Sequence, residues 1–222
     1  MNKARNCKDP LEVVGCAKGY SKEALIQDLP RHSQFSPNLL KQVKNLPEVM
    51  LRNSGTPLAK KIVRMMRDIS GEAYRAIQFT RTEINDRGVL YGVVLLKHQV
   101  LDRVLDYFHK RWPQCIICLY NEHNCKTGII NEKGLIREMK LPLKTVVEKI
   151  SDKRPIMPYF EDIQFSGEEI FETLYNTQNI QERNNPRYFK SMIPECCYKL
   201  PGLKKGVEKR FTPQNKKIDD FF

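Results

Sequence analysis

Four residues in the middle of the chain have the types and close spacing that a metal site would need. Cys115 and Cys118 are followed by His123 and Cys125, and three thiolates with one imidazole can bind zinc tetrahedrally. The run around the first two cysteines is apolar and typical of a β-strand, in which residues three apart point to opposite faces. We therefore interpret Cys115 and Cys118 as packing residues, and we predict no metal and no cofactor.

The other groups suited to acid–base chemistry show no catalytic pattern. The four histidines lie in separate predicted elements, without the spacing of a catalytic triad or a metalloprotease helix: His32, His98, His109 and His123. Neighbouring carboxylates face apart on a helix, and the sequence contains no Gly-rich phosphate loop. No catalytic centre is visible, so the sequence leaves open whether the protein is an enzyme.

The composition favours a polyanionic partner. The 222 residues contain 38 Lys and Arg against 26 Asp and Glu, which gives a net charge of +12. Such a balance attracts phosphate irrespective of sequence, so DNA, RNA and anionic membrane all fit the charge. Membrane fits least, because the sequence shows neither an apolar run of spanning length nor a signal peptide. Seven cysteines without a secretory signal predict reduced thiols in an intracellular protein.

Basic residues recur on one side of a predicted amphipathic helix that begins at Thr56 and Pro57. Apolar residues from Leu58 to Ala73 recur at helical spacing, and basic residues occupy the opposite side. A solvated helix face is the alternative interpretation of this pattern. We predict that the following residues bind DNA: Lys60, Lys61, Arg64, Arg67, Arg75, Arg81, Lys204 and Lys205.

The last nine residues have the spacing of a peptide that binds the DNA sliding clamp (PCNA), known as a PIP box. Ile218 is followed three and four positions later by Phe221 and Phe222, so one helical turn would place all three on one apolar side. The Gln usual three residues before the aliphatic is replaced by Asn215, with Gln214 one step earlier. We predict that these five residues bind the clamp. The alternative is that both Phe side chains fold back into the protein's own core.

The order of the predicted elements indicates an α+β fold. Helices are expected near 21–29 and 38–43, from Thr56, at 100–112, up to 150 and at 166–179, and strands at 76–84, 89–96, 114–120, 127–130 and 135–141. This order, ααββαβββαα, predicts an antiparallel sheet of about five strands covered by helices on one face. Residues 1–55 would form an N-terminal helical and irregular segment, 56–200 the α+β domain, and 201–222 a basic linker and flexible clamp-binding tail.

Two parts of this pattern resemble a family of uncharacterised "probable DNA metabolism" proteins. They are the stretch from about Ile62 to Asn121, and the closing motifs 182–187 (ERNNPR) and 192–194 (MIP). Members of that family occur as extensions of uracil-DNA glycosylase-like proteins and as companions of a radical SAM protein thought to modify or repair DNA. The resemblance implies a repair setting and either of these proteins as a partner. Cys196 and Cys197 depart from the family, which tends to carry aromatics there.

Together these features predict a DNA repair or DNA modification protein that binds DNA and is recruited to the sliding clamp. Two alternatives remain: a catalytic partner of a radical SAM or glycosylase-type base-repair enzyme, and a basic RNA-binding module. The clamp-like tail is not typical of the family and suggests an archaeal or eukaryote-like replication machinery. The protein would then be cytoplasmic and nucleoid-associated in an archaeon, or nuclear in a eukaryote.

Overall fold

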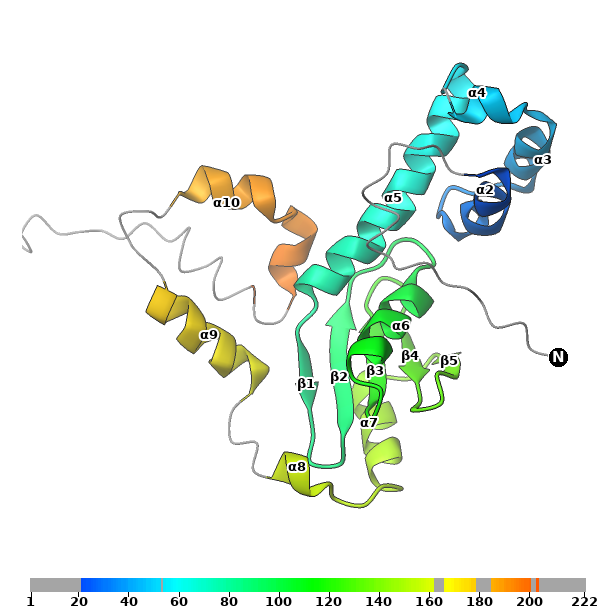
Figure 1. Cartoon of the computed structure of the whole chain (residues 1–222). Coiled ribbons are helices and arrows are strands. Elements are labelled where there is room, and N and C mark those ends of the chain that lie inside the picture. The colour runs from blue at the N-terminus through cyan, green and yellow to red at the C-terminus, as the bar shows by residue number, and fades with distance from the viewer. Residues whose placement is uncertain (1–20, 53, 162–165, 179–184, 201–202, 204–222) are drawn as a thin grey trace, which may run out of the picture.

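A long helix and a five-stranded sheet form the centre of the protein (Figure 1). The structure is a computed structural model and describes residues 21–52, 54–161, 166–178, 185–200 and 203. Helices from the N-terminal part of the chain lie beside the long helix, and the C-terminal helices lie on its other side and along the sheet edge. Within these ranges, no helix is both long and apolar enough to cross a bilayer.

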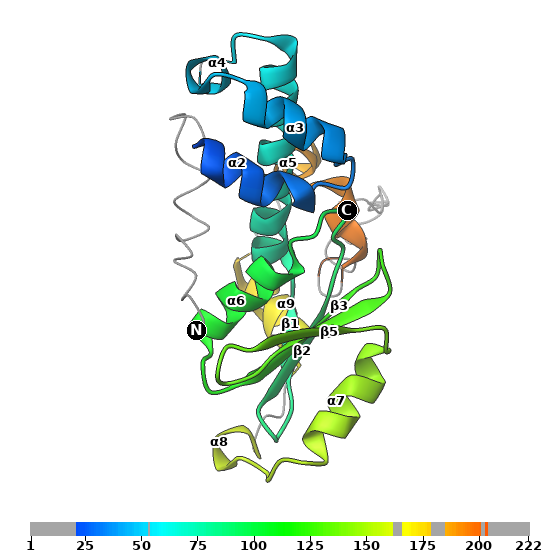
Figure 2. The ribbon, with the colours of Figure 1, turned by 90° about the vertical axis from the view of Figure 1, so that its right-hand side faces the viewer.

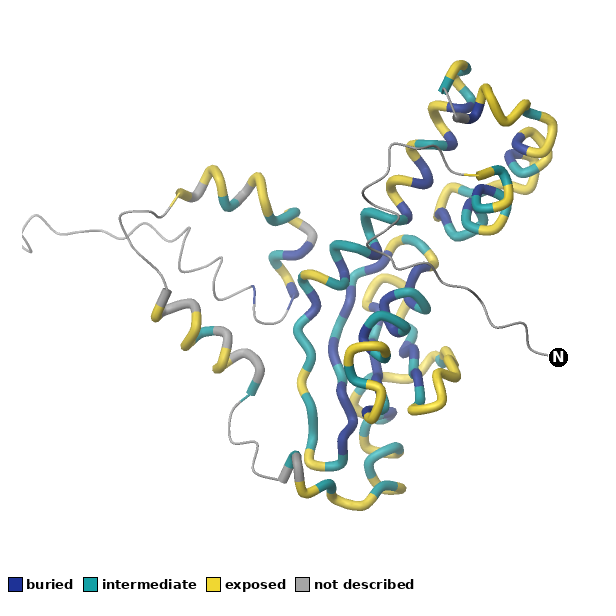
Figure 3. The backbone as a smooth tube through the Cα atoms, viewed as in Figure 1, coloured by how far each residue is buried: buried dark blue, intermediate teal, exposed yellow. Residues whose placement is uncertain are grey.

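The long helix, α5 (Pro57–Phe79), begins as its sequence predicts. The Thr56 hydroxyl accepts a hydrogen bond from the amide of Ala59 at 3.1 Å, and Pro57 occupies the first turn. The buried side chains of α5 form one stripe at helical spacing: Ala59, Ile62, Met65, Met66, Ile69, Ala73 and Ala76. The stripe therefore runs along nearly the whole helix, and Figure 3 shows buried and exposed positions alternating along it.

The prediction of a strand at 76–84 was wrong for residues 76–81. Residues 76–79 complete α5, and β1 contains only Thr82–Ile84. Ile77 and Phe79 are good strand formers, but Ala76 continues the buried helical stripe. The packing of that stripe outweighs the weak local preference for a strand.

Four short N-terminal elements pack against α5 and share its core. Leu25, Leu29, Leu39 and Val43 are all buried in the same apolar cluster as the α5 stripe. Ser21 and Ser36 cap two of the helices through hydrogen bonds from the backbone amides of Ala24 and Leu39 to their hydroxyls. The elements are α2 (Lys22–Asp28), η1 (Leu29–Arg31), α3 (Pro37–Asn45) and α4 (Glu48–Arg52).

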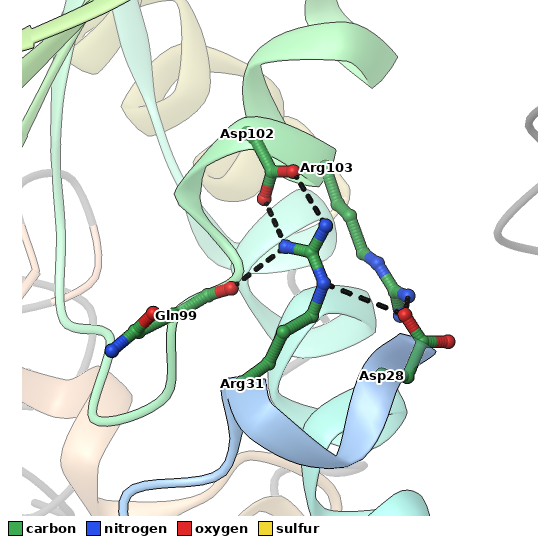
Figure 4. Close-up of polar contacts among 5 residues, drawn as sticks. All are labelled: Asp28, Arg31, Gln99, Asp102 and Arg103. Atoms are coloured by element: carbon green, nitrogen blue, oxygen red, sulfur yellow. Dashed lines mark hydrogen bonds and ion pairs between the residues drawn. The ribbon is translucent and has the colours of Figure 1, made fainter. Parts of the chain in front are cut away.

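An arginine links these N-terminal elements to the helix α6 (Leu101–Arg111), as Figure 4 shows. Arg31 donates two hydrogen bonds to the carboxylate of Asp102, at 2.6 and 2.8 Å, and a third to the carbonyl of Gln99 at 2.9 Å. Asp28 pairs with both Arg31 and Arg103. These charge-assisted bonds fix the orientation of η1 against the start of α6.

The sheet has the order β1-β2-β3-β4-β5, which confirms the α+β class and the five predicted strands. Three pairs are antiparallel, but β2 and β3 are parallel. The predicted antiparallel arrangement is thus confirmed for three of the four strand pairs. The β2–β3 pair departs from it, because α6 connects the two strands and returns the chain to the same end of the sheet. The remaining strands are β2 (Val89–Val94), β3 (Ile116–Asn121), β4 (Lys126–Ile130) and β5 (Ile136–Met139).

Helices cover both faces of the sheet, and not one face as expected. Figure 2 shows α6 on one side and α7 (Leu143–Ser151) on the other. Cys115 lies in the cluster that contains the α5 and α6 side chains. Cys118 lies with Val146 in the smaller cluster between the sheet and α7. The two thiols therefore point to opposite faces, as their spacing in a strand predicts. In the described part of the chain no group of side chains is arranged to hold a metal ion.

The last described elements of the chain lie between α8 and a cluster beside the end of α5. Ser166 and Glu169 form a capping box at the start of α9: the amide of each residue donates to the side chain of the other, at 2.7 and 3.2 Å. Further along, Cys197, Leu200 and Leu203 form a third cluster that packs against Phe79 and Leu95. The elements are α8 (Pro158–Glu161), α9 (Gly167–Gln178), α10 (Pro186–Met192) and η3 (Glu195–Lys199).

Side chains of α6 pack closely on the sheet at Gly128, and a substitution there can test this contact. A Cβ at this position of β4 would lie 2.7 Å from Cδ2 of Leu101 and 2.9 Å from Cδ1 of Leu105, both buried. We expect Gly128→Ala to lower the free energy of unfolding by about 1–3 kcal/mol, measured by urea denaturation. Gly55→Ala is the control, because nothing lies within 4 Å of its Cβ position. Equal stability of both variants would contradict the close packing.

Candidate nucleic-acid interface

Four basic residues share the side of α5 that faces away from its buried stripe. With 3.6 residues per turn, Lys60, Arg64, Arg67 and Arg75 fall within an arc of about 80°. Lys60, Arg64 and Arg67 are exposed, and Arg75 is half-buried. We call these four residues the basic ridge. The ridge is a direct consequence of the burial of the opposite side, because an amphipathic helix presents its polar positions to solvent.

The side chains of the basic ridge form no hydrogen bond or ion pair with any residue that the structure describes. Other cations of the protein are engaged: Arg31 binds Asp102, and Arg154 binds Glu132 at 2.7 Å. The charges of the ridge are therefore available to an external anion.

Two predicted DNA-binding residues lie apart from the ridge. Lys61 is exposed but lies about 100° around α5 from Lys60. Arg81 follows the helix, and its Nη1 donates to the carbonyl of Gln78 at 3.0 Å. This bond satisfies one of the last carbonyls of α5, and burial lowers the pKa of Arg81. Lys204 and Lys205 lie outside the described residues, as do the five clamp-binding residues, Gln214, Asn215, Ile218, Phe221 and Phe222.

A small pocket lies at the C-terminal end of the basic ridge. It has a volume of about 40 Å³ and is bounded by α5, by the residue after β2 and by η3 with its C-cap. Its polar residues are Glu72, Arg75 and Thr80, and its apolar wall consists of Ala76, Leu95, Cys197 and Leu200. Arg75 thus belongs to both the ridge and the pocket.

Glu72 holds the loop that precedes α6. Its carboxylate oxygens accept hydrogen bonds from the amides of Lys97 at 2.9 Å and His98 at 2.7 Å. Glu72 stands three residues before Arg75, a spacing at which opposite charges on a helix commonly pair. The two side chains nevertheless form no ion pair, and Nη1 of Arg75 lies 3.2 Å from the position of a Cβ on Gly71.

Two histidines from separate segments of the chain lie together beside α5. The rings of His32 and His98 stack with their centroids 4.3 Å apart. Nδ1 of His98 accepts from the amide of Ser33 at 3.2 Å, and Nδ1 of His32 accepts from the amide of Gln34 at 3.1 Å. Nothing in the sequence could have signalled this pair, because separate connecting segments supply the two residues and only the packing of η1 against the start of α6 brings them together.

These hydrogen bonds decide what the histidine pair can do. A ring nitrogen that accepts a hydrogen bond carries no proton, so the neutral rings carry their protons on Nε2. Neither Nε2 then has a lone pair for a metal ion or for proton abstraction. Nε2 of His32 instead points to Asp68, whose Oδ2 lies 3.8 Å away. The pair is therefore a structural contact between η1, α5 and the loop before α6.

The environment of His98 disfavours its charged form. Burial is the main cause that lowers its pKa, and the neighbouring charges of His32 and Lys97 act in the same direction. Glu72 and Asp68 oppose this effect through their negative charge. Protonation at Nδ1 would also remove the acceptor for the Ser33 amide.

Comparison with known proteins gives one family. The model of DUF4130, described as a domain of unknown function, matches residues 32–200. This range includes α5, the whole sheet and the pocket, and agrees with the expectation of an uncharacterised family. No curated protein and no solved structure matches the chain.

His98 should make stability depend on pH. Folding lowers the pKa of His98, so the unfolded chain binds the proton more readily than the folded protein does. The contribution of neutral His98 to the free energy of unfolding is therefore fully present above the ordinary pKa near 6.5. It is lost as the pH falls through the lower pKa of the folded protein. We expect His98→Asn to reduce the dependence of the free energy of unfolding on pH in this range, since Asn keeps a hydrogen-bond acceptor and does not titrate. Urea denaturation between about pH 8 and about pH 5 measures this. Identical pH profiles would contradict the assignment.

Proposed function

The chain belongs to the DUF4130 family, and we propose that it is a DNA-binding protein of DNA repair or modification that holds DNA on the basic ridge of α5. The observation that carries the proposal is the ridge itself: three exposed and one half-buried basic residue on one helix side, with no ion pair among the described residues. Unpaired cations in a row attract a polyanion, whereas cations paired within the protein do not.

The dimensions of the ridge suit a phosphate backbone. From Lys60 to Arg75, α5 rises about 22 Å at 1.5 Å per residue. Each phosphate contact releases condensed counterions, so four contacts are enough for salt-dependent binding. The ridge offers cations and no pattern of side chains for base edges, so binding should be independent of DNA sequence.

The repair setting follows from the resemblance to DNA-metabolism proteins and not from the ridge. Under this proposal the protein works beside a radical SAM or uracil-DNA glycosylase-like protein, in the compartment that holds the DNA. It contributes the DNA-binding surface, while its partner contributes the chemistry.

Recruitment to the sliding clamp is the second part of the proposal. Ile218, Phe221 and Phe222 form the apolar plug of a PIP-box peptide, and such buried anchors carry most of the energy of a contact. A tail bound to the clamp makes the encounter with DNA intramolecular. This raises the effective concentration of DNA at a surface that binds it weakly.

Neutralising the basic ridge should weaken DNA binding. We expect the triple variant Lys60→Gln, Arg64→Gln, Arg67→Gln to raise the Kd for a duplex by at least about tenfold at low salt, and to reduce the slope of log K against log salt by about 2–3. Fluorescence anisotropy over a range of salt concentrations measures both quantities.

The matched control removes three exposed lysines from the other side of the sheet: Lys144→Gln, Lys149→Gln, Lys153→Gln. Both variants change the net charge by the same amount. Equal weakening by the two variants would contradict a localised interface. Tighter binding of structured RNA than of duplex DNA, at the same salt concentration, would favour the RNA-binding alternative.

Clamp binding should depend on the two terminal aromatics. We expect purified clamp to retain the full chain and to lose the double variant Phe221→Ala, Phe222→Ala in a pull-down, because the apolar plug is removed. The variant Lys216→Ala, Lys217→Ala is the control within the same peptide. Equal retention of the full chain and the Phe variant would contradict docking through this tail.

A further inference from the structure

We propose that exposed apolar side chains of α9 and α10 form a docking surface for the C-terminal peptide of the same chain, so that docking and clamp binding exclude one another. The inference rests on the proposed function for the competing partner, the sliding clamp. The docking itself can be tested without the clamp. The contact lies on the surface of the protein and not in its core, so it can open and release the peptide.

Two apolar pairs are uncovered on these helices. Ile170 and Leu174 of α9 are 51 % and 54 % exposed, and Tyr188 and Met192 of α10 are 63 % and 59 % exposed. The residues of each pair stand four apart, so they share one side of their helix. Figure 1 shows both helices on the side of the molecule that faces away from α2 and α3. Scattered single apolar residues are normal on a protein surface, whereas four on two consecutive helices indicate a contact site.

α9 lacks the packing that normally stabilises a helix of its length. None of its described side chains belongs to the three apolar clusters. A helix of 12 residues without tertiary packing is marginally stable in water. An apolar partner that covers Ile170 and Leu174 would therefore stabilise α9 itself.

The C-terminal peptide has the matching chemistry. Its apolar residues, Ile218, Phe221 and Phe222, would lie on one side of a single helical turn. Residues 204–217 contain six Lys and Arg against one Glu, whereas α9 contains three Glu and neither Lys nor Arg. The peptide and the segment before it thus complement α9 in apolar character and in charge.

The segment that carries the peptide starts close to the docking surface. Leu203 packs in the third apolar cluster with Ile193, which directly follows Met192 of α10. Ile218 lies 15 residues beyond Leu203, a length that spans about 20 Å as a flexible chain and at most about 50 Å when extended. Because both partners belong to one chain, their effective concentration is in the millimolar range, and a weak contact is enough.

The other exposed apolar residues lie in less suitable places. Leu135 and Leu141 flank β5, which is the edge of the sheet opposite β1. Val49 and Met50 lie on α4, which precedes the first residue of α5, whereas Leu203 packs against Phe79 at the last. The two ends of α5 are about 34 Å apart. Leu135 and Met50 therefore serve as controls for Leu174 and Met192.

Nuclear magnetic resonance tests the docking without the clamp. We expect the double variant Phe221→Ala, Phe222→Ala to shift the amide signals of α9 and α10 relative to the unchanged chain, and to leave those of α4 and β5 in place. These shifts should be independent of protein concentration, because the contact lies within one chain. Unshifted signals of α9 and α10 would overturn the inference. Shifts that grow with protein concentration would assign the contact to a second copy and would also overturn it.

Competition with the clamp gives the second test. Only a chain with an undocked peptide can bind the clamp, so docking raises the Kd by the inverse of the undocked fraction. We expect the full chain to bind purified clamp about three- to tenfold more weakly than the isolated peptide 210–222 does, measured by calorimetry. The double variant Leu174→Lys, Met192→Lys should bind as tightly as the peptide, because its docking surface is lost.

The matched control makes the same two substitutions on exposed residues elsewhere, Leu135→Lys and Met50→Lys, and should bind the clamp like the unchanged chain. Urea denaturation should be the same for both double variants, since none of the four side chains belongs to an apolar cluster. Equal clamp affinity of the full chain, the peptide and both variants would refute the docking. Absence of clamp binding by the chain and by the peptide, with the amide shifts retained, would refute clamp recruitment alone.

Discussion

The burial of one side of α5 is the constraint on which the remaining structure depends. Leu25 and Leu29 of the N-terminal elements, and the side chains of α6, pack against the α5 stripe in a single core. Because that stripe is fixed against these partners, the opposite side of α5 is fixed towards solvent. The basic ridge is therefore set by the hydrophobic effect acting on the other side of the helix, and not by contacts of its own.

A second constraint is the position of Glu72. Its carboxylate binds two backbone amides of the loop before α6, and the same loop contributes His98 to the stacked pair with His32. This arrangement connects η1, α5 and the loop before α6. The hydrogen bonds of the two histidines require Nδ1 of each ring to be unprotonated, so that it can accept. Arg75, three residues beyond Glu72 on α5, forms no ion pair with its carboxylate.

The proposed function combines two weak contacts. A ridge of four cations, three of them exposed, gives sequence-independent and salt-dependent attraction to DNA, and a short terminal peptide gives attachment to the clamp. Neither contact requires the protein to recognise bases. Under the proposed function, specificity for a lesion or a reaction would then come from the partner protein.

Much of the fold was determined by the sequence alone, because local rules govern it. Thr56 and Pro57 mark a helix start, and the spacing of Cys115 and Cys118 fixes their opposite faces. The basic residues 60, 64 and 67 share one side for the same reason. Tertiary structure alone decided the parallel pairing of β2 with β3, the extension of α5 through Phe79, the stacking of His32 on His98 and the pocket at Arg75 and Thr80. These features depend on contacts between residues far apart in the chain, and periodicity in the sequence reports only on neighbours within one element.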